Sequence, residues 1–335
     1  MRAYGFILFA LLCAVLASGC SRSEIPAVEE QGVRLAFIVS DASDPWTREE
    51  LVVAADSLER FEIDLFEIVA SDDERLLEII DLLPRRGVQG LLLCAPHPSI
   101  GSAVVAKAAA RGIKLITVDT RLTDIDSEPL PVPFAGVSQS GAGRLLADSL
   151  LAQMSARNWP PDQVGILILD SQSSPEAEER IGAATKAFTD ALLPISRTFL
   201  IASTDPDSLR DAVVSTVAST VAANPSLTKW LVFSADADSA FPALSALQDA
   251  SVDSSSVIAG NVVVFPALPV FDSSTPDSLV ASCFISPNRH GFLAAEHLYK
   301  WVKDSSAPPA EILSPGLIVT RDNFDELLNR ITPLP

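Results

Sequence analysis

Residues 63–93, IDLFEIVASDDERLLEIIDLLPRRGVQGLLL, decide the fold class of this chain. Apolar residues dominate Ile63–Val69 and Leu91–Leu93, and we expect each of these runs to form a strand. Between them, Ser71 followed by Glu74 predicts a capping box that begins a helix. The apolar positions of this helix follow helical spacing: Leu76, Leu77, Ile79, Ile80 and Leu83. Buried strands that alternate with helices predict a parallel sheet covered on both faces.

The same alternation continues on both sides of this stretch. Toward the N-terminus we expect a strand at 35–39 and a helix at 49–61, and toward the C-terminus a helix at 104–111, closed by Gly112, and a strand at 115–118. The pattern then starts again. Its elements are strands at 164–169, 199–201 and 231–233, a helix opened by Ser174-Pro175, and a helix toward Ala223 opened by residues 204–207. We therefore predict an α/β fold with two doubly wound parallel-sheet lobes.

Ligands of such folds bind beyond the carboxyl ends of the strands, which places them near five loops. These loops are 40–47, 94–98, 119–120, 170–180 and 234–238. No glycine-rich phosphate-binding motif follows the first strand of either lobe, and the chain has only 15 glycines. We therefore expect no dinucleotide and no other cofactor.

The N-terminus resembles a bacterial lipoprotein signal. Arg2 precedes a short apolar run, 4–16, and the small residues of Leu16–Cys20 follow it. We expect residues 1–19 to be a signal peptide, Cys20 to be acylated, and 20–32 to be a tether. The chain is then anchored to a membrane through lipid on Cys20, at the periplasmic or extracellular face.

The charge of the chain argues against two classes of binding partner, nucleic acids and anionic lipid surfaces. The formal net charge is −19, and such a surface repels nucleic acid and anionic lipid headgroups. After removal of the signal, two internal cysteines remain, Cys94 and Cys283, both in strand-like runs. Two buried free thiols are favoured over a disulfide between them.

Catalysis has little support in the sequence. The three histidines, His97, His290 and His297, are scattered, and no cluster has the spacing of metal ligands. Residues 236–238 begin like a calcium loop but lack its glycine and distal glutamate. No nucleophile elbow or triad signature is present. We expect neither an enzyme nor a metal site, and a structural role for His290.

Several motifs resemble the type I periplasmic sugar-binding proteins, and within them the arabinose-binding branch. The similarity runs from about Val33 to Leu328, and its strongest stretches are Pro45-Trp46, 98–107, 286–287, 290–291, 298–302 and 320–324. The resemblance implies two lobes joined by a three-segment hinge, with crossings near 137–138, 285–286 and 314–316. One lobe then comprises 33–137 plus 286–314, and the other comprises 138–285 plus 315–335.

The resemblance also implies a ligand site, although the family pattern is kept only in part. Eight residues stand at sugar-contacting positions of that pattern: Asp44, Trp46, Cys94, Asp119, Thr120, Glu176, Arg180 and Asp236. Four of the family's residue types are replaced at matched positions: Ser40 stands for a lysine, Thr120 for an aspartate, Glu176 for a threonine and Asp236 for an asparagine. A further asparagine is missing from 262–264. Arabinose itself is therefore in doubt as the ligand.

The retained set still suits a polyol. Carboxylates accept hydrogen bonds from hydroxyls, a guanidinium donates to ring oxygens, and an aromatic face covers C–H groups. Arg180 is the one obvious cation among four carboxylates, so we expect a neutral sugar, or less readily an amino sugar.

Alternative roles remain open for several of these residues. Asp44 can be a turn residue, Trp46 a core residue, and Asp236 a helix cap. Glu176 gains from the helix dipole wherever it points, and Arg180 can pair with Glu176 one turn earlier.

Two functions follow. The first is a lipid-anchored, monomeric solute-binding protein that delivers a monosaccharide to the permease of an ABC importer. The alternative is a ligand-sensing or interaction lipoprotein with a degenerate cleft that docks on a membrane receptor.

Overall fold

A computed structural model describes residues 32–170, 174–202 and 206–331. The predicted signal 1–19, Cys20, and the predicted helix opening at Thr204-Asp205 lie outside these ranges. Within them, no helix is both long enough and apolar enough to cross a membrane.

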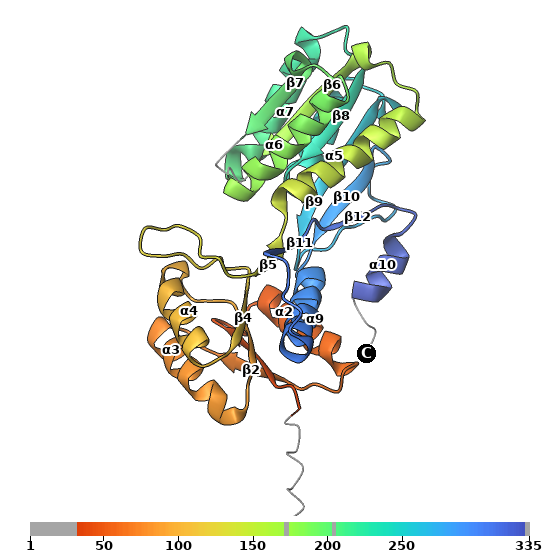
Figure 1. Cartoon of the computed structure of the whole chain (residues 1–335). Coiled ribbons are helices and arrows are strands. Elements are labelled where there is room, and N and C mark those ends of the chain that lie inside the picture. Colours follow the sequence, from red (N-terminus) through yellow and green to blue (C-terminus); the bar gives the residue numbers. More distant parts are fainter. Residues whose placement is uncertain (1–31, 171–173, 203–205, 332–335) are drawn as a thin grey trace, which may run out of the picture. The chain divides into compact units, whose positions relative to one another are not determined.

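The described part of the chain contains two six-stranded sheets, each flanked by its own helices (Figure 1). The first has the order β11-β5-β4-β3-β1-β2, and every pair in it is parallel. Its strands are β1 (Leu35–Val39), β2 (Leu65–Val69), β3 (Gly90–Leu93), β4 (Lys114–Val118), β5 (Phe134–Val137) and β11 (Glu311–Ser314). The predicted α/β class with parallel sheets is confirmed here.

The second sheet has the order β12-β10-β9-β8-β6-β7. Its strands are β6 (Val164–Asp170), β7 (Thr198–Ala202), β8 (Lys229–Ser234), β9 (Val257–Val264), β10 (Leu279–Ile285) and β12 (Leu317–Val319). All pairs are parallel except β10–β12, which is antiparallel, so the prediction of a purely parallel sheet is wrong at this edge. The reason is the connection, because β12 follows β11 after Pro315 and Gly316 and enters the sheet at the carboxyl end of its strands.

Helices cover both faces of each sheet. On the first sheet, α2 (Pro45–Glu59) and α9 (Asn288–Asp304) pack on one face, and α3 (Asp73–Leu82) and α4 (Gly101–Ala110) pack on the other. On the second, α5 (Gln139–Ala156) and α6 (Pro175–Asp190) lie opposite α7 (Pro206–Ala223) and α8 (Ala240–Asp249), while α10 (Phe324–Ile331) packs at the edge near β12. Four apolar clusters fill these layers. The central strands of each sheet are almost entirely buried, whereas the edge strand β2 has no buried residue and the edge strand β7 has one.

Helix starts differ from the predicted ones because other side chains provide the caps. Asp72, not Ser71, caps α3, since its carboxylate accepts from the backbone N–H of Arg75 at 2.8 Å. Asp44 caps α2, which begins at Pro45 and not at Glu49. The predicted caps at the other two helices are confirmed: Ser174 precedes α6, and Gly112 follows α4 with φ of +67°.

The chain passes between the two sheets three times. β5 belongs to the first sheet and α5 packs on the second, so one passage lies around Ser138. The second lies between β10 and α9, and the third between β11 and β12, where Gly316 has φ of +83°. Cys94 and Cys283 are free thiols, as the sequence favoured.

Candidate functional site

A cavity of about 740 Å³ is lined by residues that follow the carboxyl ends of strands in both sheets. Its volume lies within the range of small-molecule sites. Five predicted residues line it, and they are Trp46, Asp119, Thr120, Glu176 and Arg180. Lining residues that the sequence did not single out include Arg121, Ser138, Gln139, Ser140 and Glu179.

Asp119 follows β4 and has φ of +55°, a left-handed conformation that few residues other than glycine adopt. Its carboxylate Oδ2 accepts a hydrogen bond from Nε1 of Trp46 at 2.5 Å. Trp46 lies in the first turn of α2, and it also packs against the core of the second sheet. Trp46 is therefore both a core residue, through its packing on the second sheet, and a residue of the cavity wall.

Arg180 lies on α6, and its side chain is held by groups of the second sheet and α5. Its Nε donates to Oε1 of Gln139 at 2.7 Å, and its Nη1 donates to the carbonyl of Ala235 at 2.9 Å. Neither of these bonds goes to Glu176, the alternative partner. Arg180 is only 6 % exposed, and this burial lowers its pKa. Its guanidinium therefore lies at the cavity wall already oriented.

The acidic side of the cavity differs from the prediction. Glu176 and Glu179, both in the first turns of α6, line it and are exposed. A second cation, Arg121, lines it as well, so the prediction that Arg180 is the one obvious cation is wrong. Arg121 pairs with Glu311 at 2.5 Å and stacks on Phe134 at 3.9 Å. The sequence could have indicated Arg121, because it is a basic residue only two positions after the predicted site residue Asp119.

Three predicted residues do not line the cavity. Asp44 accepts from the backbone and hydroxyl of Thr47 as the cap of α2. Asp236 accepts from the backbone N–H groups of Asp238 and Ser239, both at 2.9 Å, in the turn before α8. Asp44 is the N-cap of α2, in the turn before Pro45 that the sequence left open for it. Asp236 bonds within the turn ahead of α8, whose N-cap residue is Ser239.

Cys94, the third, lies behind the cavity wall, with its Sγ 3.8 Å from Oγ1 of Thr120. Burial raises the pKa of the Cys94 thiol to about 12, so the thiol stays neutral at physiological pH. A buried neutral thiol packs as a small apolar group and is not a nucleophile.

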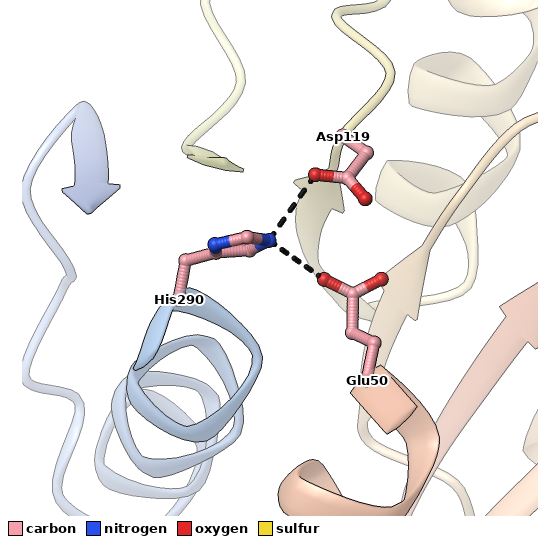
Figure 2. Close-up of side chains that lie close together, drawn as sticks. All are labelled: Glu50, Asp119 and His290. Atoms are coloured by element: carbon pink, nitrogen blue, oxygen red, sulfur yellow. Dashed lines mark ion pairs between the residues drawn. The ribbon is translucent and has the colours of Figure 1, made fainter. Parts of the chain in front are cut away.

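Behind Asp119 lies a buried ionic cluster that the sequence did not predict (Figure 2). Nε2 of His290 is 3.2 Å from Oδ1 of Asp119 and 3.0 Å from Oε1 of Glu50. The side chains of His290 and Glu50 are 0 % and 1 % exposed, as expected for the structural role predicted for His290. His290 also contacts Asp119, a residue of the cavity wall. Glu50 shares the face of Ala54 and Leu58 at helical spacing, and this pattern was the available signal.

Opposing effects act on the pKa values of this cluster. Burial acts to lower the pKa of His290, but hydrogen bonds to Asp119 and Glu50 outweigh it and raise the pKa to about 9. Burial raises the pKa of Glu50 to about 7, against the hydrogen bond to His290. The spacing of the three groups would also suit a divalent cation, within 4.8 Å. A protonated imidazole between two carboxylates accounts for the same contacts without an ion.

The comparisons with known proteins agree with this arrangement. Residues 33–326 match the model of a family described as periplasmic binding proteins and the sugar-binding domain of the LacI family. Two relatives are similar over nearly the whole chain. An ABC transporter L-arabinose-binding periplasmic protein of Azospirillum brasilense is 27 % identical over 95 % of this chain and 94 % of its own length. An L-arabinose-binding periplasmic protein of Escherichia coli K12 is 24 % identical over 95 % and 96 %.

Among solved structures, a periplasmic ribose ABC transporter protein of Conexibacter woesei is similar in fold. It covers 89 % of this chain and 95 % of its own, with a TM-score of 0.63 and 13 % identity. At this identity the likeness concerns the fold, and it supports the two-sheet α/β architecture.

Proposed function

Because this chain belongs to the family of periplasmic binding proteins and LacI-type sugar-binding domains, whose solute-binding members are not enzymes, we propose that it binds a monosaccharide for an ABC importer. The two arabinose-binding relatives, both periplasmic, support this proposal and a periplasmic location. The permease of the importer is then the protein partner, and the binding protein acts as a monomer. A net charge of −19 argues against nucleic acid as a partner.

The observation that carries the proposal is the wall of the cavity. It combines an aromatic ring, Trp46, with a carboxylate, Asp119, and an oriented guanidinium, Arg180. An aromatic face covers the C–H patch of a sugar, while the carboxylate accepts from hydroxyls and the guanidinium donates to oxygens. A site for a polyol requires groups of these types facing one cavity.

The acidic residues of the cavity favour a neutral sugar over an acidic one. Asp119, Glu176 and Glu179 line it against two cations, Arg121 and Arg180, and Arg121 is already paired with Glu311. A uronate or a sugar phosphate would add a charge of the sign already in excess, which is unfavourable in a partly desolvated site. An amino sugar remains compatible with this charge balance.

Arabinose is expected to bind poorly or not at all. Ser40 and Thr120 stand where the resemblance implies a lysine and an aspartate, and neither replacement carries the charge of the original. Val264 of β9 lines the cavity, in the stretch where the resemblance implies an asparagine. Because the cavity wall has fewer charged and amide groups at these positions, we expect it to select a sugar whose hydroxyl groups are arranged differently from those of arabinose.

Closure of the two lobes on the sugar is part of this proposal, and the three passages of the chain support a hinge between the lobes. We assign 33–137 plus 286–314 to one lobe and 138–285 plus 315–335 to the other, joined by a three-segment hinge. Residues that precede α5 and α6 then meet those that follow β4 when a sugar is bound, which excludes water from the site.

The anchor rests on the sequence around Cys20. We expect residues 1–19 to be removed and Cys20 to carry lipid, which holds the protein at the membrane. Replacing Cys20 by Ser should leave the protein unprocessed or release it as a soluble form in a membrane fractionation. A variant that is processed and membrane-bound like the parent would contradict lipidation at Cys20.

A second candidate is a ligand-sensing or interaction lipoprotein with a degenerate cleft that docks on a membrane receptor. The observation in its favour is that Asp44, Asp236 and Arg180 are all bonded to groups of the protein itself. A thermal-shift panel of neutral pentoses and hexoses, amino sugars, uronates and sugar phosphates separates the two. Stabilisation by a neutral or amino sugar supports the transport role, and a panel without any response supports the second candidate. Selective stabilisation by a uronate or phosphate would contradict the site assignment.

A further inference from the structure

The ionic cluster behind the cavity connects the cavity wall to the interior of the first lobe (Figure 2). Asp119 lines the cavity and its side chain is 25 % exposed, whereas the side chains of His290 and Glu50 are buried. The three residues come from the end of β4, from α9 and from α2, elements that pack together through one apolar cluster. Asn288, in the first turn of α9, also donates to Glu49 of α2 at 2.6 Å.

Two carboxylates that approach the same imidazole nitrogen need a positive charge. Nε2 carries at most one proton in either charge state of the ring and so donates to only one carboxylate at a time; a protonated ring adds the positive charge that offsets the second carboxylate. A protonated His290 balances one of the two carboxylates and places its Nε2–H between Glu50 and Asp119.

Both oxygens of Asp119 are held in place by this arrangement. Oδ1 faces Nε2 of His290 and Oδ2 accepts from Nε1 of Trp46, while the backbone N–H donates to the carbonyl of Ala135 at 2.9 Å. A carboxylate offers about four acceptor sites, so two of them stay open for a ligand. The side chain is therefore an oriented acceptor before any ligand binds.

We propose that His290 and Glu50 are positioning residues of the sugar site, which orient the Asp119 carboxylate as an acceptor for sugar hydroxyls. This inference rests on the proposed function and names residues that do not touch the sugar themselves. It also specifies the ligand, since a fixed carboxylate acceptor selects hydroxyl or ammonium donors and rejects anions.

Other titratable groups near the cluster are Asp44, on the N-terminal side of α2, and Cys94, after β3. Both interact electrostatically with Glu50. The Cys94 thiol stays neutral because burial raises its pKa to about 12, and the negative charge of Asp44 acts to raise the pKa of Glu50. Neither group opposes the increase in the pKa of His290 that Asp119 and Glu50 cause.

The first arm of the test needs no ligand. The chain has three histidines, so ¹⁵N-histidine NMR of the full-length protein resolves the titration of each. We expect His290 to titrate near pH 9, well above His297, whose pKa burial lowers. Glu50→Gln and Asp119→Asn should each lower the His290 midpoint by a pH unit or more. Titration of the Trp46 indole ¹⁵N signal with the same midpoint as His290 would show that the charge reaches the cavity wall. A His290 midpoint at or below the ordinary value, unchanged in both variants, would overturn the proposal.

The second arm measures affinity for the neutral or amino sugar that stabilises the parent most in the thermal-shift panel. His290→Gln and Glu50→Gln should each raise Kd about tenfold, whereas His97→Gln, at an exposed site, serves as the matched control. Unchanged Kd in both cluster variants would overturn the positioning role. If no sugar binds the parent, the proposed function fails, and the NMR arm still decides whether the cluster holds Asp119.

Discussion

Replacing His290 by Gln should change how the free energy of unfolding depends on pH. The pKa of a histidine in an unfolded chain is about 6.5, and in the folded protein the carboxylates of Asp119 and Glu50 raise that of His290 to about 9. A group with a raised pKa stabilises the folded state fully below the unfolded value, and this contribution is lost as pH rises through the folded value. The shift corresponds to about 3 kcal/mol between pH 6.5 and 9.

Glu50 acts in the same direction at lower pH. Burial raises its pKa from 4.5 to about 7, so the folded protein binds this proton more tightly than the unfolded chain does. Stability therefore also falls between about pH 4.5 and 7 as Glu50 ionises. Above pH 7, the remaining dependence of stability on pH within this cluster therefore comes from His290 alone.

The variant should be less stable than the parent by about 3 kcal/mol at pH 6.5, because the contacts of protonated His290 with Asp119 and Glu50 are lost. This difference should shrink as pH rises toward 9.5, where the parent has lost the same charge. Urea denaturation of both proteins at intervals from pH 6 to 9.5 measures it, with His97→Gln, at an exposed site, as the control whose curve should follow the parent. A difference between parent and His290→Gln that stays constant over this range would refute a protonated His290.

Three further outcomes are expected from other parts of the structure. Asp72→Ala should destabilise the protein by about 1 kcal/mol in urea denaturation, because α3 loses its cap, whereas Ser71→Ala should have almost no effect. Gly143→Ala should lower stability by about 1–3 kcal/mol, since the added methyl group meets the backbone carbonyl of Arg180 where α5 and α6 pack; an unchanged melting temperature would contradict this close approach. Gln139→Ala should weaken binding of the preferred sugar about tenfold in calorimetry, because Nε of Arg180 loses the acceptor that orients it; equal affinity would show that Arg180 needs no such support.

The sequence predicted the strands well because their burial leaves a direct mark. Leu35–Val39 and Val164–Asp170 are buried at every position, and continuous apolar runs of this length between helical patterns are typical of strands covered on both faces. The antiparallel β12 could not be predicted this way. Its three residues carry too little pattern, and its direction depends on where the chain enters the sheet.

Candidate site residues were predicted less completely, for a physical reason. A carboxylate near a strand end can cap a helix or contact a ligand, and only the geometry distinguishes Asp236 from Asp119. Glu50 and His290 lie on apolar helix faces, and their charges are tolerated only because they meet across elements that are distant in sequence. No local pattern shows such a meeting.

Calorimetric titration of the preferred neutral or amino sugar into the parent and into Asp119→Ala tests the central claim most directly. Loss of the oriented acceptor should raise Kd roughly 5- to 150-fold, which corresponds to about 1–3 kcal/mol. Asp64→Ala, which removes an exposed carboxylate outside the cavity lining, is the matched control and should bind like the parent. Equal affinity in the parent and in Asp119→Ala would contradict the account, because the cavity wall around Asp119 would then not be the sugar site.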